Sequence, residues 1–336
     1  MGNILDNAIK ETIILGDNDK NKKRFHIAMT GTPDYIPRLG VVMGSILQSN
    51  VTMSFIFHFF LEYIPDAELE KLQAIVKKTD SLIYIHLMDN QVFTPLIFGK
   101  KTAVFFYRFV VSEVVGDLSD RILYLDGDTI CRGSIKKLEE IDLKDYLGAV
   151  VSDRREHRSM THLNTSRFFN AGMMLIHTSQ WKKEGIFDKV VELAISELKY
   201  IDEKGKHKLW QGESYNDQNI LNVLLDQRLL FLPKKYNYIF WLGVASPFKN
   251  HFRNENYKEQ IILHFAGNVK PWSSWVQELP VVQEYASFQR NTPWKDTSLK
   301  EPEGYKDFHQ AARMAIKYKH WKQALVFYGR YILAKI

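Results

Sequence analysis

The sequence predicts an α/β fold with a largely parallel sheet flanked by helices and followed by a C-terminal helical appendage. Apolar runs of strand length alternate with amphipathic runs of helix length from residue 25 onwards. The strand-length runs are apolar throughout, which is typical of parallel strands covered on both faces. The acidic tripeptide Asp126-Gly127-Asp128 follows one such run, and ligands of open α/β sheets bind at the carboxyl ends of strands. We therefore expect a Rossmann-like sheet with a ligand site at those ends.

Length and composition narrow the class of protein. A chain of 336 residues can form one large domain with an appendage, or two smaller domains. Its 45% hydrophobic and 25% charged residues are typical of a soluble globular protein. A net charge of +6 is too small to indicate nucleic acid as a partner, and we expect none. The single cysteine, Cys131, excludes an internal disulfide and a CxxC metal site.

The N-terminus and the apolar segments predict the location of the protein. Residues 1–6 lack the basic start and the long apolar core of a signal peptide. No apolar stretch approaches the roughly 18 residues needed to span a bilayer. We therefore expect a cytoplasmic protein.

The first part of the chain contains the clearest alternation of strands and helices. Residues 1–23 are polar and end in a charged run, so we expect them to form a loose N-terminal extension. We expect strands at 25–30, 53–60, 82–87 and 121–125. Helices are expected at 37–48, 65–78 and 102–115. Pro37 supports the first of these helices, because proline suits the first turn.

The pattern is looser after Asp128. Strands are expected at 148–152, 168–177 and 261–265, and helices at 179–199 and 217–225. We find no internal repeat and no low-complexity tract.

The C-terminal segment differs in charge from the rest. After a linker-like stretch at 293–304, residues 308–336 contain no Asp or Glu. They carry these cations: Arg313, Lys317, Lys319, Lys322, Arg330 and Lys335. Apolar residues recur there at spacings of four and three, which predicts one helix with an apolar face: Met314, Tyr318, Trp321, Leu325, Tyr328 and Ile332. Such a helix fits the surface of an anionic bilayer; alternatively, it packs on the protein's own core with solvated lysines.

The D-x-D tripeptide at 126–128 is the first candidate for chemistry. It places two carboxylates one residue apart at the end of an expected strand. Mg²⁺ and Mn²⁺ prefer oxygen ligands and commonly share a few carboxylates with substrate phosphates. The alternative is a solvated acidic turn containing glycine.

Three later segments contain polar residues that fit the same site. His264 ends an apolar run and precedes Gly267 and Lys270; imidazole can bind Mn²⁺, glycine allows close backbone approach, and lysine is a point charge for phosphate. Small residues flank an amide at 169–172, which suits a hydroxyl-rich ligand, and a polar cluster at 215–219 enters a helix. The alternatives are a structural histidine and a helix N-cap with solvated neighbours.

In order and approximate spacing, these motifs resemble glycosyltransferase family 8, and within it the bacterial lipopolysaccharide core α-hexosyltransferases. The resemblance runs from about residue 25 to the C-terminus. Its motifs are FYRF at 106–109, YLDGD at 124–128, FNAG at 169–172, YNDQNILN at 215–222 and HFAGNVKPW at 264–272. The segment NTPWKD at 291–296 resembles the lipopolysaccharide glucosyltransferase branch.

The resemblance implies a GT-A fold, a UDP-hexose donor, Mn²⁺ or Mg²⁺, and retention of anomeric configuration. The matching metal ligands are Asp126, Asp128 and His264, and Gly267 and Lys270 match the diphosphate grip. The groups matching those around the donor sugar and its reacting carbon are Arg108, Asp153, Asn170, Asp217 and Gln218, and Ala171 is also expected to bind the UDP-sugar. The other expected donor-binding residues are Thr30, Thr32, Asp34, Tyr35 and Gly127.

Two departures from the family pattern affect these expectations. Thr32 and Asp34 occupy the places where the family usually has an Asp and an Asn that hold the uridine. Asn219 replaces a second carboxylate after Gln218, which weakens any scheme with a nucleophilic carboxylate at that position.

The expected function is transfer of glucose or galactose from UDP-glucose or UDP-galactose to the lipopolysaccharide core. We expect the catalytic domain at 24–290, and a linker with a basic aromatic helix at 291–336 that holds the enzyme on the inner face of the cytoplasmic membrane. One alternative is a glycosyltransferase of the same fold with a soluble or protein acceptor. Another is a non-catalytic membrane-surface protein that binds a nucleotide or metal. The full set of acidic, His and Lys residues argues against the latter, because binding alone does not need all of them.

Overall fold

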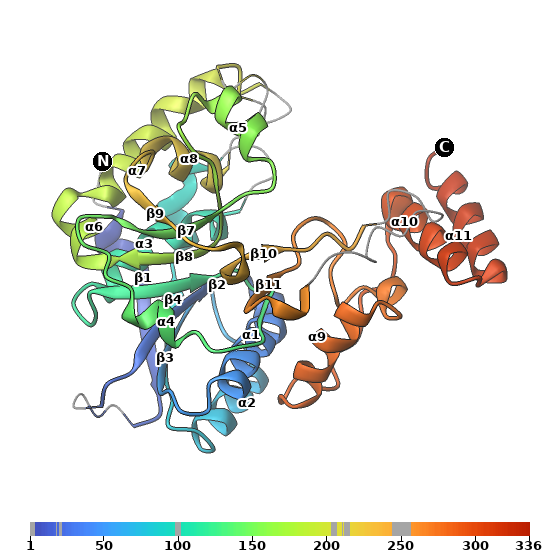
Figure 1. Ribbon diagram of the computed structural model, residues 1–336, viewed down its shortest axis with the longest axis horizontal. Helices are drawn as coiled ribbons and strands as arrows, with labels where there is room; N and C mark the ends of the chain where they lie inside the picture. Colours follow the sequence, from blue (N-terminus) through green and yellow to red (C-terminus); the bar gives the residue numbers. More distant parts are fainter. Residues whose placement is uncertain are drawn as a thin grey trace.

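The computed structural model describes residues 4–17, 19, 22–97, 102–202, 207–209, 211, 216–243 and 257–336. A twisted sheet with helices on both faces forms the body, and a helical C-terminal segment extends from it along the long axis (Figure 1). Within these ranges, no helix has the length and apolar character needed to cross a bilayer.

The central sheet has eight strands in the order β1-β4-β3-β2-β5-β8-β7-β9. Their bounds, in chain order, are β1 Ile9–Leu15, β2 Phe25–Thr30, β3 Phe55–Leu61, β4 Leu82–Met88, β5 Arg121–Leu125, β7 Gly148–Ser152, β8 Phe169–His177 and β9 Leu229–Phe231. Strands β4, β3, β2 and β5 pair in parallel, as do β7 and β9. Strand β8 runs antiparallel to β5 and β7, and β1 runs antiparallel to β4. The predicted largely parallel α/β sheet is confirmed.

A second, small sheet positions the site. It consists of β6 Thr129–Cys131, β10 Tyr238–Ile239 and β11 Ile262–His264. Strand β6 begins directly after Asp128 and pairs antiparallel with β11, so that Thr129 lies opposite His264. This register brings the end of β11 beside the D-x-D turn, although the two segments are far apart in sequence.

Two apolar clusters cover the faces of the central sheet. Helices α1 Ile36–Ser49 and α2 Asp66–Val76 pack on one face. The other face carries α3 Val104–Val115, α6 Thr178–Glu184, α7 Ile186–Glu197 and α8 Asp217–Leu224. The side chains of β2 alternate between the two clusters, with Ile27 on one side and Ala28 on the other. Burial on both faces explains why the strands read as continuous apolar runs.

The remaining α-helices are α4 Lys136–Glu140, α5 Glu156–Leu163, α9 Pro280–Arg290, α10 Gly304–Lys317 and α11 Trp321–Leu333.

The C-terminal part of the chain packs around a third apolar cluster, which includes residues of α9 and α10. Met314 of α10 is 2% exposed and packs with residues of α9 and β11. Trp294 fastens the segment before α10 to α1, because a Cβ on Gly40 would lie 2.2 Å from its ring.

Three predicted elements differ from the structure. Residues 1–23 were expected to be loose, which is wrong for β1: it is an edge strand that pairs with β4, and only Leu15 of its residues is buried. The helix expected at 179–199 is divided into α6 and α7 at Gly185, which has φ +60°. The single C-terminal helix is also wrong: α10 and α11 form a hairpin, with Lys319 at φ 62° between them.

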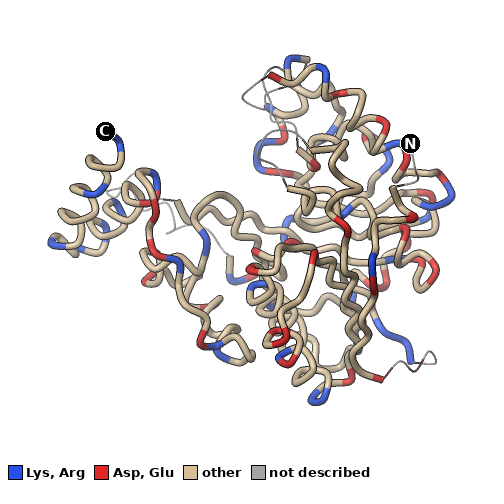
Figure 2. Tube along the Cα trace, turned by 180° about the vertical axis from the view of Figure 1, so that it is seen from behind, with Lys and Arg blue, Asp and Glu red and all other residues tan. Residues whose placement is uncertain are grey.

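The hairpin explains why the spacing of apolar residues was misleading. The pattern continues across the turn, but its first half packs on the body and its second half lies on α11, where Leu325 is 75% exposed. Lys and Arg are spread over this hairpin, and Asp and Glu are confined to its beginning (Figure 2).

Candidate active site

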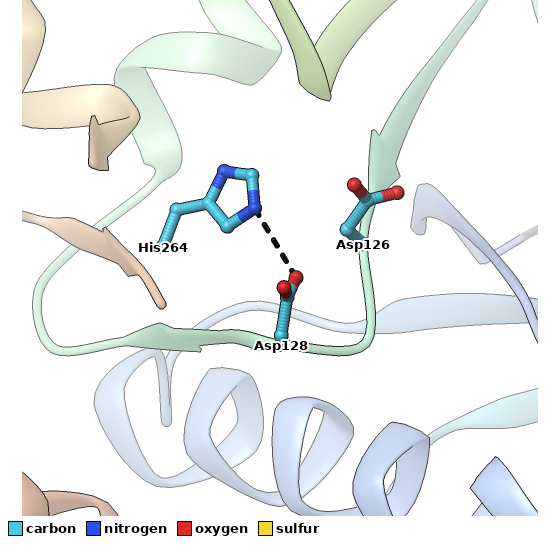
Figure 3. A group of neighbouring side chains, drawn as sticks. All are labelled: Asp126, Asp128 and His264. Carbon is cyan, nitrogen blue, oxygen red and sulfur yellow. Dashed lines mark ion pairs between the residues drawn. The ribbon is translucent and has the colours of Figure 1, made fainter. Parts of the chain in front are cut away.

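Two carboxylates and one imidazole meet where β5, β6 and β11 converge. Asp126 follows β5, Asp128 precedes β6, and His264 ends β11. One potential ligand atom from each residue lies within 4.8 Å of the others. Nε2 of His264 is 3.2 Å from Oδ1 of Asp128, and the two side chains point toward each other with Asp126 beside them (Figure 3).

These three residues fit a divalent cation. Asp128 is buried, and its Oδ1 lies 3.2 Å from Nε2 of His264. The donor set of two carboxylates and an imidazole suits Mn²⁺ or Mg²⁺. A buried carboxylate is costly unless an ion or a cationic group satisfies it, so the geometry agrees with a metal site.

The charged side chains of the site balance one another. Burial by itself raises the pKa of Asp128, but the charge and hydrogen bonds of His264 and Lys270 outweigh it and hold that pKa below its usual range. Burial lowers the pKa of His264, and Asp128 reverses this effect, so the net shift is upward. Nζ of Lys270 contacts Oδ2 of Asp128 and donates to the carbonyl of Phe265 at 3.0 Å.

Glycines allow the close approach of these groups. A Cβ on Gly172 would lie 2.2 Å from Cε1 of His264 and 2.8 Å from Oδ2 of Asp126. Gly267 has φ +92°, a conformation that L side chains rarely adopt. Gly172 is required because there is no room for a side chain, and Gly267 is required because of its positive φ.

Arg108 of α3 links the first carboxylate of the D-x-D turn to the start of α8. Its guanidinium is 3.1 Å from Oδ1 of Asp126 and 2.6 Å from Oδ2 of Asp217, and it donates to the carbonyl of Ala171 at 2.9 Å. Burial would lower the pKa of Arg108, but Asp217 and other neighbouring groups raise it above its usual value. Arg108 therefore carries a permanent charge between two carboxylates.

A cluster of amides lies next to Arg108. Nδ2 of Asn170 donates to Oε1 of Gln218 at 3.1 Å and to Oδ2 of Asp153 at 3.3 Å. The backbone N–H of Ala171 also donates to Oε1 of Gln218, and Nε2 of Gln218 donates to Asp153. Both ends of the Gln218 amide are therefore held in place.

A cavity of about 410 Å³ opens beside the D-x-D turn. The expected donor-binding residues that line it are Thr30, Thr32, Tyr35, Arg108, Asp126, Gly127 and Asp128. Asp34 is exposed and is not among the lining residues. Tyr215, part of the predicted polar cluster, lies outside the described residues. The alternative interpretation of that cluster as an N-cap is confirmed for Asn216, whose side chain accepts from the N–H of Asn219 at 2.8 Å.

Sequence reasoning missed two residues that contact the predicted set. Tyr124 donates to Oδ1 of Asp126 at 3.0 Å and is 2.9 Å from Oγ1 of Thr30. Its position two residues before Asp126 could have indicated this, because alternate strand residues share a face. Asn237 contacts His264 and Asn170; it lies in an irregular segment with no comparable signal.

The chain is similar to known glycosyltransferases over most of its length. It is 28% identical over 322 residues to the lipopolysaccharide 1,3-galactosyltransferase of Salmonella typhimurium, a match that covers 93% of this chain and 92% of the relative. It is 27% identical over 306 residues to the lipopolysaccharide glucosyltransferase WaaO of Escherichia coli K12, covering 88% and 87% of the two chains.

The crystal structure of the galactosyltransferase LgtC, in complex with donor and acceptor sugar analogues, has the same fold. It superposes with a TM-score of 0.64 at 19% identity and covers 80% of this chain and 96% of that one. This likeness confirms the predicted GT-A fold. Residues 26–276 also match the sequence profile of glycosyl transferase family 8. The chain therefore belongs to glycosyltransferase family 8 and is a sugar-transferring enzyme.

Proposed function

We propose that this enzyme transfers glucose or galactose from UDP-glucose or UDP-galactose to the lipopolysaccharide core oligosaccharide, with Mn²⁺ or Mg²⁺ and with retention of configuration. The observation that carries the proposal is the convergence of Asp126, Asp128, His264 and Lys270 beside a cavity and a buried amide cluster. The sugar and acceptor classes are supported by relatives that are lipopolysaccharide galactosyl- and glucosyltransferases matched over nearly their whole length.

The charges of the site suit a diphosphate leaving group. Asp126, Asp128 and His264 would hold the cation, which when bound supplies Lewis-acid stabilisation of the departing UDP. Lys270 pairs with Asp128. With a cation bound to that carboxylate, the ammonium of Lys270 would be available for the diphosphate. Gly267 provides a backbone that can approach the phosphates closely.

The donor's other two parts are assigned to separate groups. Thr30, Thr32, Tyr35 and Gly127 line the cavity, and we assign the uridine to them. Asp34 is exposed outside this lining and is left out of the proposed contact set.

The hexose is assigned to the amide cluster and its neighbours, because hydroxyl groups need both donors and acceptors at fixed positions. Its proposed contacts are Arg108, Asp153, Asn170, Ala171, Asp217 and Gln218. With the uridine at the cavity, the diphosphate would lie between the two groups.

The contacts of the catalytic residues favour a front-face reaction. Asp217 is paired with Arg108, and both ends of the Gln218 amide are held by neighbours, so neither is disposed to attack the anomeric carbon. The bond between that carbon and the phosphate oxygen breaks while the acceptor hydroxyl forms the new glycosidic bond on the same face. The hydroxyl proton passes to the departing phosphate oxygen.

Membrane association belongs to the proposal as well. We take 24–290 as the catalytic domain and 291–336 as the linker and membrane-associating segment, with α11 as the part that meets lipid. On α11, Trp321, Leu325 and Leu333 are exposed and lie near Lys322 and Arg330 in sequence. Each basic residue near an anionic surface contributes about 1 kcal/mol, so several cations together would hold the enzyme beside a lipid-anchored acceptor on the cytoplasmic face.

The test is incubation of the pure protein with radiolabelled UDP-glucose or UDP-galactose, with and without chelator, and with a lipid-linked core acceptor. We expect metal-dependent UDP release and label in the acceptor, with an α-linkage by NMR. Release of UDP that the chelator does not affect would overturn the proposed metal dependence. Transfer to soluble saccharides or proteins, but not to the core, would support the alternative of a soluble or protein acceptor.

A further inference from the structure

Asn237 lies between the metal cluster and the sugar-side amides. Its side chain is almost completely buried, in the short segment between the 3₁₀ turn Lys234–Tyr236 and β10. Oδ1 is 3.0 Å from Nδ1 of His264, and Nδ2 is 2.9 Å from Oδ1 of Asn170. The amide of Asn237 therefore contacts both His264, a proposed metal ligand, and Asn170, a residue proposed to bind the sugar.

The direction of these hydrogen bonds follows from neighbouring groups that can act only as donors or only as acceptors. The backbone N–H of Gly172 can only donate, and it lies 3.0 Å from Oδ1 of Asn170, so this end of Asn170 must be the oxygen. The other end then faces the carboxylate of Asp153, which can only accept when ionised. Both neighbours assign the same orientation to Asn170.

The orientation of Asn170 determines the next two groups. Because Asn170 presents an oxygen, Asn237 must present its NH₂ there and its oxygen to His264. Nδ1 of His264 must then carry the proton and donate it. Nε2, the nitrogen 3.2 Å from Asp128, is left with its lone pair directed at the metal cluster when the ring is neutral.

We propose that Asn237 is a positioning residue that holds His264 in the Nδ1–H tautomer and so presents Nε2 to the cation; this rests on the metal site of the proposed function. A histidine that binds a metal through one ring nitrogen commonly donates a hydrogen bond from the N–H of the other, which fixes the orientation and the tautomer of the ring. Here the acceptor is an amide that is itself oriented by the sugar-side residues, so the metal site and the sugar site share one hydrogen-bonded chain.

The test compares Mn²⁺ affinity, measured by electron paramagnetic resonance, in the wild type, Asn237→Ala and Asn50→Ala. Asn50 is the matched control, because its buried amide bonds to the carbonyls of Ile46 and Gly133 and to no site residue. We expect Asn237→Ala to weaken Mn²⁺ binding about 10- to 100-fold and Asn50→Ala to leave it unchanged. Equal Mn²⁺ affinity in the wild type and Asn237→Ala overturns the proposed role of Asn237 but not the proposed metal site. No Mn²⁺ binding by the wild type overturns the proposed metal site and this inference with it.

A second measurement does not depend on the folding of a variant. ¹⁵N-histidine NMR of the Zn²⁺-loaded wild type, with His264 assigned from the spectrum of His264→Gln, reports which ring nitrogen bears the proton. A proton on Nδ1 supports the proposal. A proton on Nε2, with the ion on Nδ1, overturns it.

Discussion

At the scale of single residues, the two carboxylates of the D-x-D turn have different partners. Asp128 contacts His264 and Lys270, whereas Asp126 is held by Arg108 and Tyr124. Burial raises the pKa of Tyr124, so its hydroxyl stays protonated and donates to Asp126. Asp126 is thus oriented by Arg108 and Tyr124, whereas Asp128 is the more buried carboxylate and faces the imidazole of His264 and the ammonium of Lys270.

This difference predicts unequal effects of substitution. Asp128→Asn removes a charge from the proposed metal site and leaves Lys270 without its counter-ion, so we expect transfer to fall below detection, by at least about 1,000-fold in kcat/KM. Gln218→Ala removes hydrogen bonds but no reacting atom in a front-face reaction, and slow turnover should persist. Steady-state kinetics with labelled donor measure both. A comparable total loss in the two variants would argue for a nucleophilic role at Gln218.

Gly172 gives a steric prediction. Gly172→Ala places a methyl group 2.2 Å from the His264 ring, so we expect a displaced imidazole, weaker Mn²⁺ binding and a destabilisation of about 1–3 kcal/mol from overpacking. The control is Gly133→Ala, whose added carbon would meet its nearest neighbour at 3.6 Å. Urea unfolding and Mn²⁺ titration provide the readouts. Unchanged Mn²⁺ binding in folded Gly172→Ala would show that the ring position is not needed for the ion.

How much of the site could be predicted from the sequence depends on the residue. Asp126, Asp128, His264 and Lys270 carry chemistry that suits a metal and phosphate, and their motifs match a family. Asn237 could not be found in this way, because its role arises from the packing of β10 beside β11 and not from a local pattern.

At the scale of elements, buried strands were the easiest to predict and edges the hardest. Strands β2, β5 and β7 have the expected bounds, because continuous apolar runs flanked by polar residues leave little choice of boundary. Strand β1 escaped prediction because it relies on pairing with β4 more than on burial of its own side chains. The hairpin of α10 and α11 escaped because helical spacing continues through its turn.

The sheet contains a line of buried histidines that gives a prediction about pH. Nδ1 of His26 is 3.0 Å from Nε2 of His58, Nδ1 of His58 is 3.1 Å from Nε2 of His86, and Nδ1 of His86 is 3.0 Å from Oγ1 of Thr12. The line crosses β2, β3, β4 and β1. Burial lowers the pKa of His26 and of His86 to about 4, and burial together with the neighbouring histidines lowers the pKa of His58 below its usual value.

These shifts predict loss of stability in acid. Because the folded pKa values lie below the unfolded value of about 6.5, the unfolded chain binds more protons, and the free energy of unfolding falls as pH drops below about 6.5. Between pH 7 and pH 5, His26 and His86 should each contribute about 1–2 kcal/mol of this loss. Urea unfolding at several pH values should show a smaller decline for His86→Gln than for the wild type. Replacing the exposed His157 by Gln should leave the decline unaltered; equal slopes in all three proteins would contradict the prediction.

At the scale of the whole molecule, the two helices of the C-terminal hairpin have different surroundings, although the sequence predicted one continuous helix. α10 belongs to the body through Met314, whereas α11 lies outside it and presents exposed apolar side chains. The two helices pack against each other, and the rings of His309 and Tyr331 stack with their centroids 4.8 Å apart. Truncation before residue 308 would therefore expose part of the core, and a cleaner test of membrane association changes α11 alone.

The variant for that test replaces Trp321 and Leu325 by serine. Both side chains are more than half exposed, so the fold and donor hydrolysis should persist. Binding to anionic vesicles should weaken at least about tenfold, because each large apolar side chain contributes about 1.5–3 kcal/mol when fully removed from water. Sedimentation with phosphatidylserine and phosphatidylcholine vesicles measures the effect, and the loss should be clearest on the anionic lipid at low salt. Leu299→Ser, at an exposed position before α10, is the matched control. If the α11 variant sediments as well as the wild type, this helix does not meet lipid and its exposed face must serve a different contact.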